Sequence, residues 1–332
     1  MSDLFSIALS NLLSPMVLFF ALGFLAALAR SDLSIPEPIA KGLSLYLMLA
    51  IGFKGGAGVA AHGIDTTLLL TAVAGVALSF LLPFIAFALL KRLSKLDGID
   101  AAAVAAHYGS ISIVTFVSGS EFLGLMGVSY EGYLVAVMAL METPAIISGL
   151  WLASRYLKRD EDGGNSDGNG QSELFREVFL NGSVVLLIGA FVIGAATGSK
   201  GMETVAPFID APFKGILCFF LLDMGLIAAS RLREARVISP GLISFGLIMP
   251  LIGATFGIAA GWLIGLSIGG TALMAVLSAS ASYIAVPAAM RLALPEANPA
   301  VYLTLSLAIT FPFNLTVGIP LYLSVAQMTA GG

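Results

Sequence analysis

Hydroxyl side chains at a repeated spacing are the first candidates for chemistry in this strongly apolar chain. The segment HYGSISIVTF, residues 107–116, contains Ser110 and Ser112, and the segment SASASYIAV, residues 278–286, contains Ser280 and Ser282. Serine hydroxyls can donate hydrogen bonds to an anion or offer oxygen to a hard cation. The alternative is that these small residues only allow helices to pack closely.

A carboxylate inside an apolar stretch is the second candidate. Glu142 lies in MALMETPAI, and an ionisable group within a membrane span marks a functional site unless it is paired or hydrated. The corresponding stretch in the second half of the chain is TFPFN, residues 310–314. Carboxylate, hydroxyl, amide and freed carbonyl oxygens suit a small hard cation. We predict an Na⁺ site here, with a structural hydrogen bond as the alternative; its residues are Glu142, Thr143, Thr310 and Asn314.

Asp223, in FFLLDMGL, is the other acid deep in an apolar stretch. It can serve as a proton site, or as a structural partner of a backbone amide near the end of its helix.

Motifs of several enzyme classes do not occur in the sequence. It has no Walker A motif and no H-E-x-x-H, and it contains only two histidines and one cysteine, Cys218. We therefore predict no enzymatic activity and no cofactor. Any active transport would draw on an ion gradient, with Na⁺ as the coupling ion.

The composition requires a membrane around these residues. Of the 332 residues, 58% are hydrophobic and 11% charged, and the mean hydropathy is +0.98, whereas soluble domains carry about 25% charged residues. The net charge of −4 gives no indication of nucleic-acid binding. The N-terminus lacks a basic region typical of a cleaved signal peptide. We predict an all-α polytopic protein of the lipid bilayer.

Hydropathy predicts ten transmembrane helices, since each span needs roughly 20 apolar residues. The predicted spans are 12–29, 38–60, 67–90, 101–118, 132–155, 179–198, 206–230, 241–265, 270–291 and 299–328. Residues 158–173 form a Gly/Asn/Asp/Ser-rich segment that is typical of a flexible cytoplasmic linker. The linker separates two five-helix halves, residues 1–157 and 174–332.

The distribution of positive charge predicts the topology. Of the 16 lysines and arginines, all except Lys54, Lys200 and Lys214 fall at the odd-numbered loops of the ten-helix arrangement. The positive-inside rule then makes those loops cytoplasmic. We predict a bacterial inner-membrane protein with both termini on the periplasmic side. Because each half has five helices, the two halves must be inverted relative to each other.

An internal repeat supports the inverted halves and locates the candidate site. Ser110 and Ser112 correspond to Ser280 and Ser282, and YLVAVMALMETPAIISG (133–149) parallels YLTLSLAITFPFNLTVG (302–318). We predict that helices four and nine are broken and cross, because half-helix N-termini and serines at such crossings bind anions in inverted-repeat transporters. The predicted substrate-binding residues are Ser110, Ile111, Ser112, Ser280, Ala281, Ser282 and Tyr283.

At these motifs the chain resembles the cyanobacterial sodium-dependent bicarbonate transporter family (SbtA type). Further similar segments lie between about residue 36 and residue 328: VSYEGY (128–133), METP (141–144), PEANPAVY (295–302), GIPLY (318–322) and VAQ (325–327). The resemblance implies a core domain of helices 3–5 and 8–10, about 67–155 and 241–328. It also implies a gate domain of helices 1, 2, 6 and 7, about 12–60 and 179–230.

The resemblance further implies a homotrimer assembled through the gate domain, a cytoplasmic PII-like regulator, and an anion bound where helices four and nine cross. It adds Thr115 to the cation-binding residues. The chain departs from the family at Tyr283, where members carry an acid, and at Ile113 and Val114, where they carry small residues.

We predict a secondary-active, sodium-coupled symporter of a small anion that works by alternating access, with bicarbonate as the default substrate. Two alternatives stay open. One is a sodium- or proton-coupled transporter of another inorganic or carboxylate anion, which Tyr283 and Ile113 favour. The other is a membrane sensor or scaffold that binds an anion without moving it.

Overall fold

The protein is helical throughout the part of the chain that the structure describes. The structure, a computed structural model, describes residues 9, 11–63, 65–156, 182–234 and 238–330, and these ranges contain no strand. The predicted linker, 158–173, and the first residues of the predicted sixth span lie outside them.

Eight segments in these ranges are long and apolar enough to cross a membrane, which confirms the prediction of an all-α polytopic membrane protein. They are Glu37–Ala61, Thr66–Leu93, Gly98–Leu125, Leu134–Ala153, Val185–Ile209, Phe213–Arg233, Pro240–Ile264 and Pro299–Thr329. Two shorter apolar helices, Pro15–Leu28 and Ile268–Ala279, overlap the other two predicted spans, 12–29 and 270–291.

Several of these apolar segments are interrupted rather than continuous helices. The uninterrupted or merely kinked ones are α2 (Pro15–Leu28), α3 (Glu37–His62), α4 (Thr66–Leu93), α10 (Gly182–Ile209), α11 (Phe213–Glu234) and α12 (Pro240–Ile264). The interrupted ones are built from α5 (Gly98–Gly109), α6 (Ile113–Leu125), α7 (Leu134–Leu140), α8 (Pro144–Ala153), α13 (Ile268–Ala279) and α14 (Ala285–Ala293). The last segment joins α15 (Pro299–Leu303), the π-helix η1 (Thr304–Thr310), α16 (Phe311–Phe313), the π-helix η2 (Asn314–Gly318) and α17 (Ile319–Ala330).

Short polar side chains set where the helices start. The carboxylate of Asp65 accepts a hydrogen bond from Leu68 N at 2.8 Å before α4, and that of Asp97 accepts one from Asp100 N at 2.8 Å before α5. The hydroxyl of Ser267 accepts one from Gly270 N at 3.0 Å before α13. Each cap satisfies an otherwise free N–H at a helix end.

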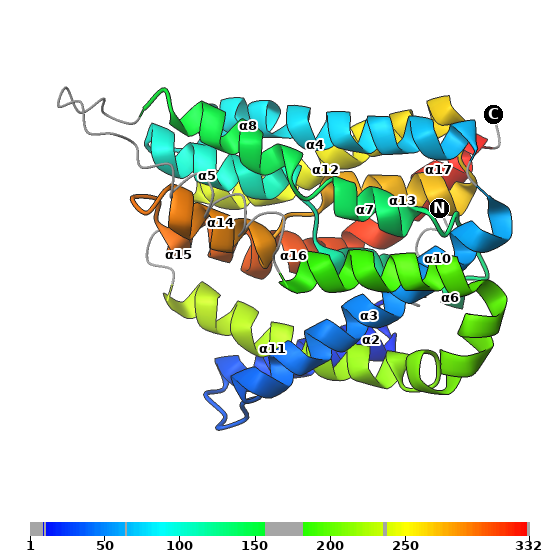
Figure 1. Cartoon of the computed structure of the whole chain (residues 1–332). Helices are drawn as coiled ribbons and strands as arrows, with labels where there is room; N and C mark the ends of the chain where they lie inside the picture. The colour runs from blue at the N-terminus through cyan, green and yellow to red at the C-terminus, as the bar shows by residue number, and fades with distance from the viewer. Residues whose placement is uncertain (1–8, 10, 64, 157–181, 235–237, 331–332) are drawn as a thin grey trace.

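The helices form two groups that Figure 1 shows one above the other. Helices α2, α3, α10 and α11 lie in the lower part, and α4, α5, α8, α12 and α13 in the upper part. Within the lower group α3 packs against α10, and α2 against α11. Glycines make these contacts close: Gly56 of α3 faces the backbone of Phe191, and Gly225 of α11 faces the backbone of Phe20. Such close backbone approach holds helices together in lipid, where the hydrophobic effect does not.

We predict that Gly56→Ala destabilises the lower group, because its methyl group would meet the carbonyl oxygen of Phe191. The expected loss is about 1–3 kcal/mol, as for other overpacked sites, seen as a lower melting temperature in detergent. Gly42→Ala, in the same helix but with open space around its Cα, is the matched control and should melt as wild type does. Equal melting of the two variants would contradict the close packing.

Candidate functional site

The chain leaves helical geometry between α5 and α6, where the first serine pair lies. Ser110 and Ser112 are extended (φ −87°, ψ 170° and φ −110°, ψ 111°). The hydroxyl of Ser112 accepts a hydrogen bond from Thr115 N at 3.2 Å, so that α6 begins with a serine cap in the buried interior. The break predicted in this segment is present, and Thr115 forms the first turn after it.

A second break, residues 280–284, separates α13 from α14. Ser280 is extended (φ −80°, ψ 161°), and its hydroxyl donates to Leu277 O at 2.9 Å. Ser282 accepts a hydrogen bond from Val286 N at 3.5 Å at the start of α14. Ala281 is buried between the two serines.

The two breaks lie against each other and share hydrogen bonds. Ser112 N donates to the hydroxyl of Ser280 at 2.9 Å, and Ser282 N donates to His107 O at 2.8 Å. These bonds satisfy backbone groups that the breaks would otherwise leave free in an apolar interior. The structure thus brings together the four serines that the sequence singled out, from helices far apart in the chain.

Glu142 lies at a third interruption, between α7 and α8, next to the two breaks. Its backbone carbonyl accepts a hydrogen bond from Ser110 Oγ at 3.2 Å. Its side chain is only 4% exposed, and Oε2 has no hydrogen-bond partner. Thr143, half-buried, is the residue before α8. A buried carboxylate oxygen without a partner is costly, so it favours a bound cation or a proton.

A small cavity connects Glu142 with both breaks. This inner cavity has a volume of about 10 Å³, and its lining residues are Ile111, Ser112, Ile113, Glu142, Ser282, Tyr283 and Ile284. Its volume is close to the minimum that one water molecule needs. One cavity therefore holds residues assigned separately to the anion and to the cation.

Thr310 and Asn314 are hydrogen-bonded elsewhere. Thr310 Oγ1 donates to Gly246 O at 2.7 Å, a carbonyl without its usual helical partner because Pro250 has no N–H. Tyr108 Oη lies 2.6 Å from the same hydroxyl. Asn314 Nδ2 donates to Ala279 O at 2.9 Å, and Asn314 Oδ1 accepts from Tyr322 Oη at 2.8 Å. Both side chains already stabilise the interrupted helices around the site.

Tyr283 separates the inner cavity from a larger one. Its ring packs edge-on against Phe311 with 5.6 Å between ring centroids, and its hydroxyl is buried. Tyr283 and Ile284 also line the wide cavity, of about 450 Å³, between α3 and α11 on one side and α14, α15 and η1 on the other. Four charged residues line it as well: Glu37, Lys41, Asp223 and Arg231.

Sequence reasoning picked out Asp223 but not its three charged neighbours in the wide cavity. Glu37 and Lys41 lie in the first turns of α3 and Arg231 in the last turn of α11, where charges usually only anchor a helix end. The only signal in the sequence for these three residues was that they lie near the ends of predicted spans. Only the packing of α3 against α11 shows that they share a cavity with a buried acid.

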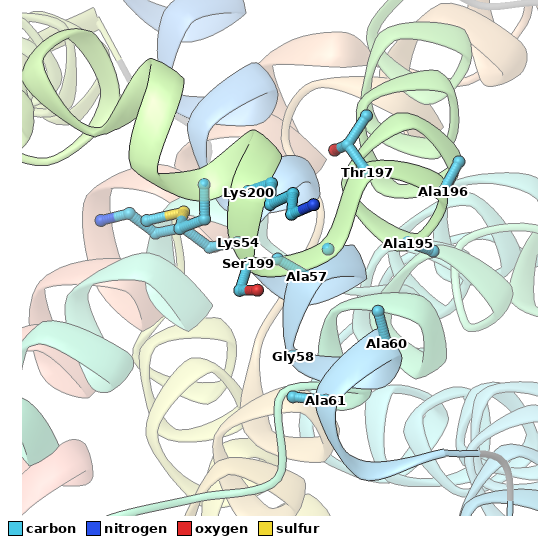
Figure 2. A pocket seen from close by; sticks show the side chains of 12 residues that line it. Lys54, Ala57, Gly58, Ala60, Ala61, Ala195, Ala196, Thr197, Ser199 and Lys200 are labelled. Atoms are coloured by element: carbon cyan, nitrogen blue, oxygen red, sulfur yellow. The ribbon is translucent and has the colours of Figure 1, made fainter.

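A third cavity, of about 670 Å³, does not touch any predicted site residue. It lies between α3 and α10, near Gly198, where the backbone of α10 is non-helical. Figure 2 shows Lys54 and Lys200 on its wall among small side chains. The ammonium of Lys54 is paired with Asp210 at 2.6 Å. We therefore take the crossing of the two broken helices as the candidate site.

The fold and this buried polar crossing define a polytopic α-helical membrane protein with interrupted helices that meet in its interior, an architecture found in transport proteins. A family model, the Na⁺-dependent bicarbonate transporter superfamily, matches residues 15–327. The chain belongs to that superfamily, which confirms the resemblance carried by its motifs. No curated protein matched the chain significantly.

We predict that Ser280→Ala weakens the crossing, because Ser112 N would lose its buried acceptor. An unsatisfied buried donor costs about 1–3 kcal/mol, which a lower melting temperature in ligand-free buffer would report. Ser278→Ala is the matched control: Ser278 is also buried, lies two residues earlier in the last turn of α13, and its hydroxyl has no partner. If Ser278→Ala melts lower than Ser280→Ala, the hydrogen bond does not hold the two breaks together.

Proposed function

We propose that the protein is a secondary-active symporter of Na⁺ and a small anion, with bicarbonate as the default substrate. The observation that carries this is the inner cavity, where two interrupted helices place serines beside the unpaired carboxylate oxygen of Glu142. Membership of the Na⁺-dependent bicarbonate transporter superfamily supports both the coupling ion and the anion.

The anion would bind at the two breaks. Helices α6 and α14 begin there, and helix N-termini favour negative charge through free N–H groups and a partial positive charge. Ser110, Ser112, Ser280 and Ser282 would add hydroxyl contacts, with Ile111, Ala281 and Tyr283 completing the wall. The hydrogen bonds that these serines now make would be exchanged for bonds to the anion as the cavity widens.

The cation would bind on the Glu142 side of the same cavity. Glu142, Thr143 and Thr115 offer hard oxygen ligands of the kind Na⁺ requires. Thr310 and Asn314 would join the shell only by giving up acceptor contacts with Tyr108 and Tyr322. Sodium beside the breaks would offset the charge of the anion, so that each ion favours binding of the other.

A ten-helix inverted repeat is the membrane arrangement that we propose. Two features of the helices support it: α5 and α13 each have 12 residues, and they begin the same distance apart in sequence as Ser110 and Ser280. A proline also lies inside the corresponding helix of each half, Pro83 in α4 and Pro250 in α12. The short α2 and the α13–α14 pair would be the first and ninth spans. The bias of basic residues would place both termini in the periplasm of a bacterial inner membrane.

Alternating access would move a core domain against a gate domain. The four helices of the lower group in Figure 1, α2, α3, α10 and α11, would be the gate, and through the gate the protein would form the homotrimer that the family resemblance implies. A PII-like regulator would bind the cytoplasmic face, in line with the same resemblance. The wide cavity would be the cytoplasmic route, because Lys41 and Arg231 line it.

A different transported anion is the second candidate. Ile111, Ile113, Ile284 and Tyr283 give the inner cavity an apolar wall, which favours a substrate with some apolar surface over bicarbonate. A third candidate, a sensor or scaffold, would bind an anion without moving it. A thermal-shift screen of inorganic and carboxylate anions, with and without Na⁺, distinguishes the substrates, and binding without uptake identifies the sensor.

We predict that proteoliposomes containing the protein accumulate labelled bicarbonate when an inward Na⁺ gradient is imposed. Replacing Na⁺ with K⁺ or using protein-free liposomes should abolish accumulation, because the anion would then lack its driving ion. Uptake equal to that of protein-free liposomes would exclude bicarbonate as the substrate.

Glu142→Gln should remove the Na⁺ stimulation of uptake and the thermal stabilisation by Na⁺, because the amide keeps the shape of the side chain but loses its charge. Glu203→Gln, at an exposed carboxylate of α10, is the control and should keep both responses. Gel filtration checks that both variants fold. Unchanged Na⁺ activation in Glu142→Gln would refute a cation role for this residue.

A further inference from the structure

Asp223 is a buried acid that the proposed symport does not use. It lies in the middle of α11, is 4% exposed, and its Oδ2 has no hydrogen-bond partner. It also lines the wide cavity, whose volume of about 450 Å³ holds several water molecules. An ionised carboxylate in this position is poorly compensated, whereas water in the cavity gives it a source of protons.

The formal charges of the residues that line the wide cavity, Asp223 included, sum to zero. Among the described residues, the wide cavity is lined by two acids, Glu37 and Asp223, and two bases, Lys41 and Arg231. Tyr283, opposite on the core side, is the other titratable group on the wall. Helices α2 and η1, which also pack against α11, contain no ionisable side chain. One proton on Asp223 therefore changes the wall from balanced to net positive.

Asp223 lies where a change in its charge would affect an anion on its way to the inner cavity. Tyr283 and Ile284 line both the wide cavity and the inner cavity, so an anion moving between them passes the wall that Asp223 faces. Charges on the low-dielectric wall of a cavity act more strongly than the same charges in open water. Glu37 and Lys41 are exposed and therefore better screened by solvent than Asp223.

We propose that Asp223 is a proton-binding site of the wide cavity, and that its protonation admits the anion to the inner cavity. The proton comes from water in the wide cavity and returns to it when the acid ionises. The second part of this proposal rests on the proposed anion transport, whereas the first does not.

The test of the proton site is an infrared titration of the purified full-length protein in lipid. Acidification of wild type should produce a carboxyl C=O band that is missing from Asp223→Asn. Glu37→Gln, which removes a carboxylate from the exposed end of the same cavity, should keep the band. Identical spectra of wild type and Asp223→Asn across the titration would overturn the proton site, whether or not the protein transports anything.

The test of its effect is equilibrium exchange of the labelled anion across proteoliposomes, with the same pH on both sides and the anion concentration held constant. Exchange by wild type and Glu37→Gln should accelerate on acidification, on the order of fivefold for one charge. Asp223→Asn should be fast at every pH, because it permanently lacks the negative charge. An equal acceleration in Asp223→Asn would overturn the control of anion entry, and the infrared titration would still decide the proton site.

Discussion

Hydrogen bonding of interrupted backbone in a medium without water is the constraint on which this structure depends. A membrane interior offers no partner to a free N–H, so a helix can be broken there only where another polar group replaces the lost bond. The breaks at Ser110–Ser112 and 280–284 meet this requirement through each other: Ser112 N reaches Ser280 Oγ, and Ser282 N reaches His107 O. Each break therefore requires the other, and together they keep helix termini and hydroxyls at a buried crossing.

The surrounding helices supply the remaining bonds. Ser110 Oγ reaches the carbonyl of Glu142, and Thr310 Oγ1 reaches the carbonyl left free by Pro250. Asn314 reaches Ala279 O at the end of α13. With these backbone groups satisfied, the carboxylate of Glu142 still has one oxygen without a hydrogen-bond partner. These backbone groups at the crossing are hydrogen-bonded, whereas the carboxylate of Glu142 is not fully compensated. Such a site is suited to a cation that binds reversibly.

The sequence allowed the prediction of those features that depend on local pattern. Alternating serines predicted the breaks, and an acid in an apolar stretch predicted a buried Glu142, because both signals lie within one segment. The roles of Thr310 and Asn314 depended on distant partners, Gly246 and Ala279, that no local pattern specifies. The inner cavity was missed for the same reason: Glu142 and Tyr283 come from opposite halves of the chain and meet only through tertiary packing.

Tyr283 lies between the inner cavity at the crossing and the wide cavity that leads to it. Its ring contacts Phe311, and Phe311 packs edge-on against Phe20 of α2 at 5.5 Å, so an aromatic row runs from the broken helix to the lower group. A relative movement that carries Phe20 along with α2 would change the packing of this row, which ends at the ring between the inner and the wide cavity. A bulky aromatic side chain can close a passage through packing alone, whereas a carboxylate would add a charge repelling an anion. Tyr283 is thus a residue through which a movement of α2 could reach the inner cavity.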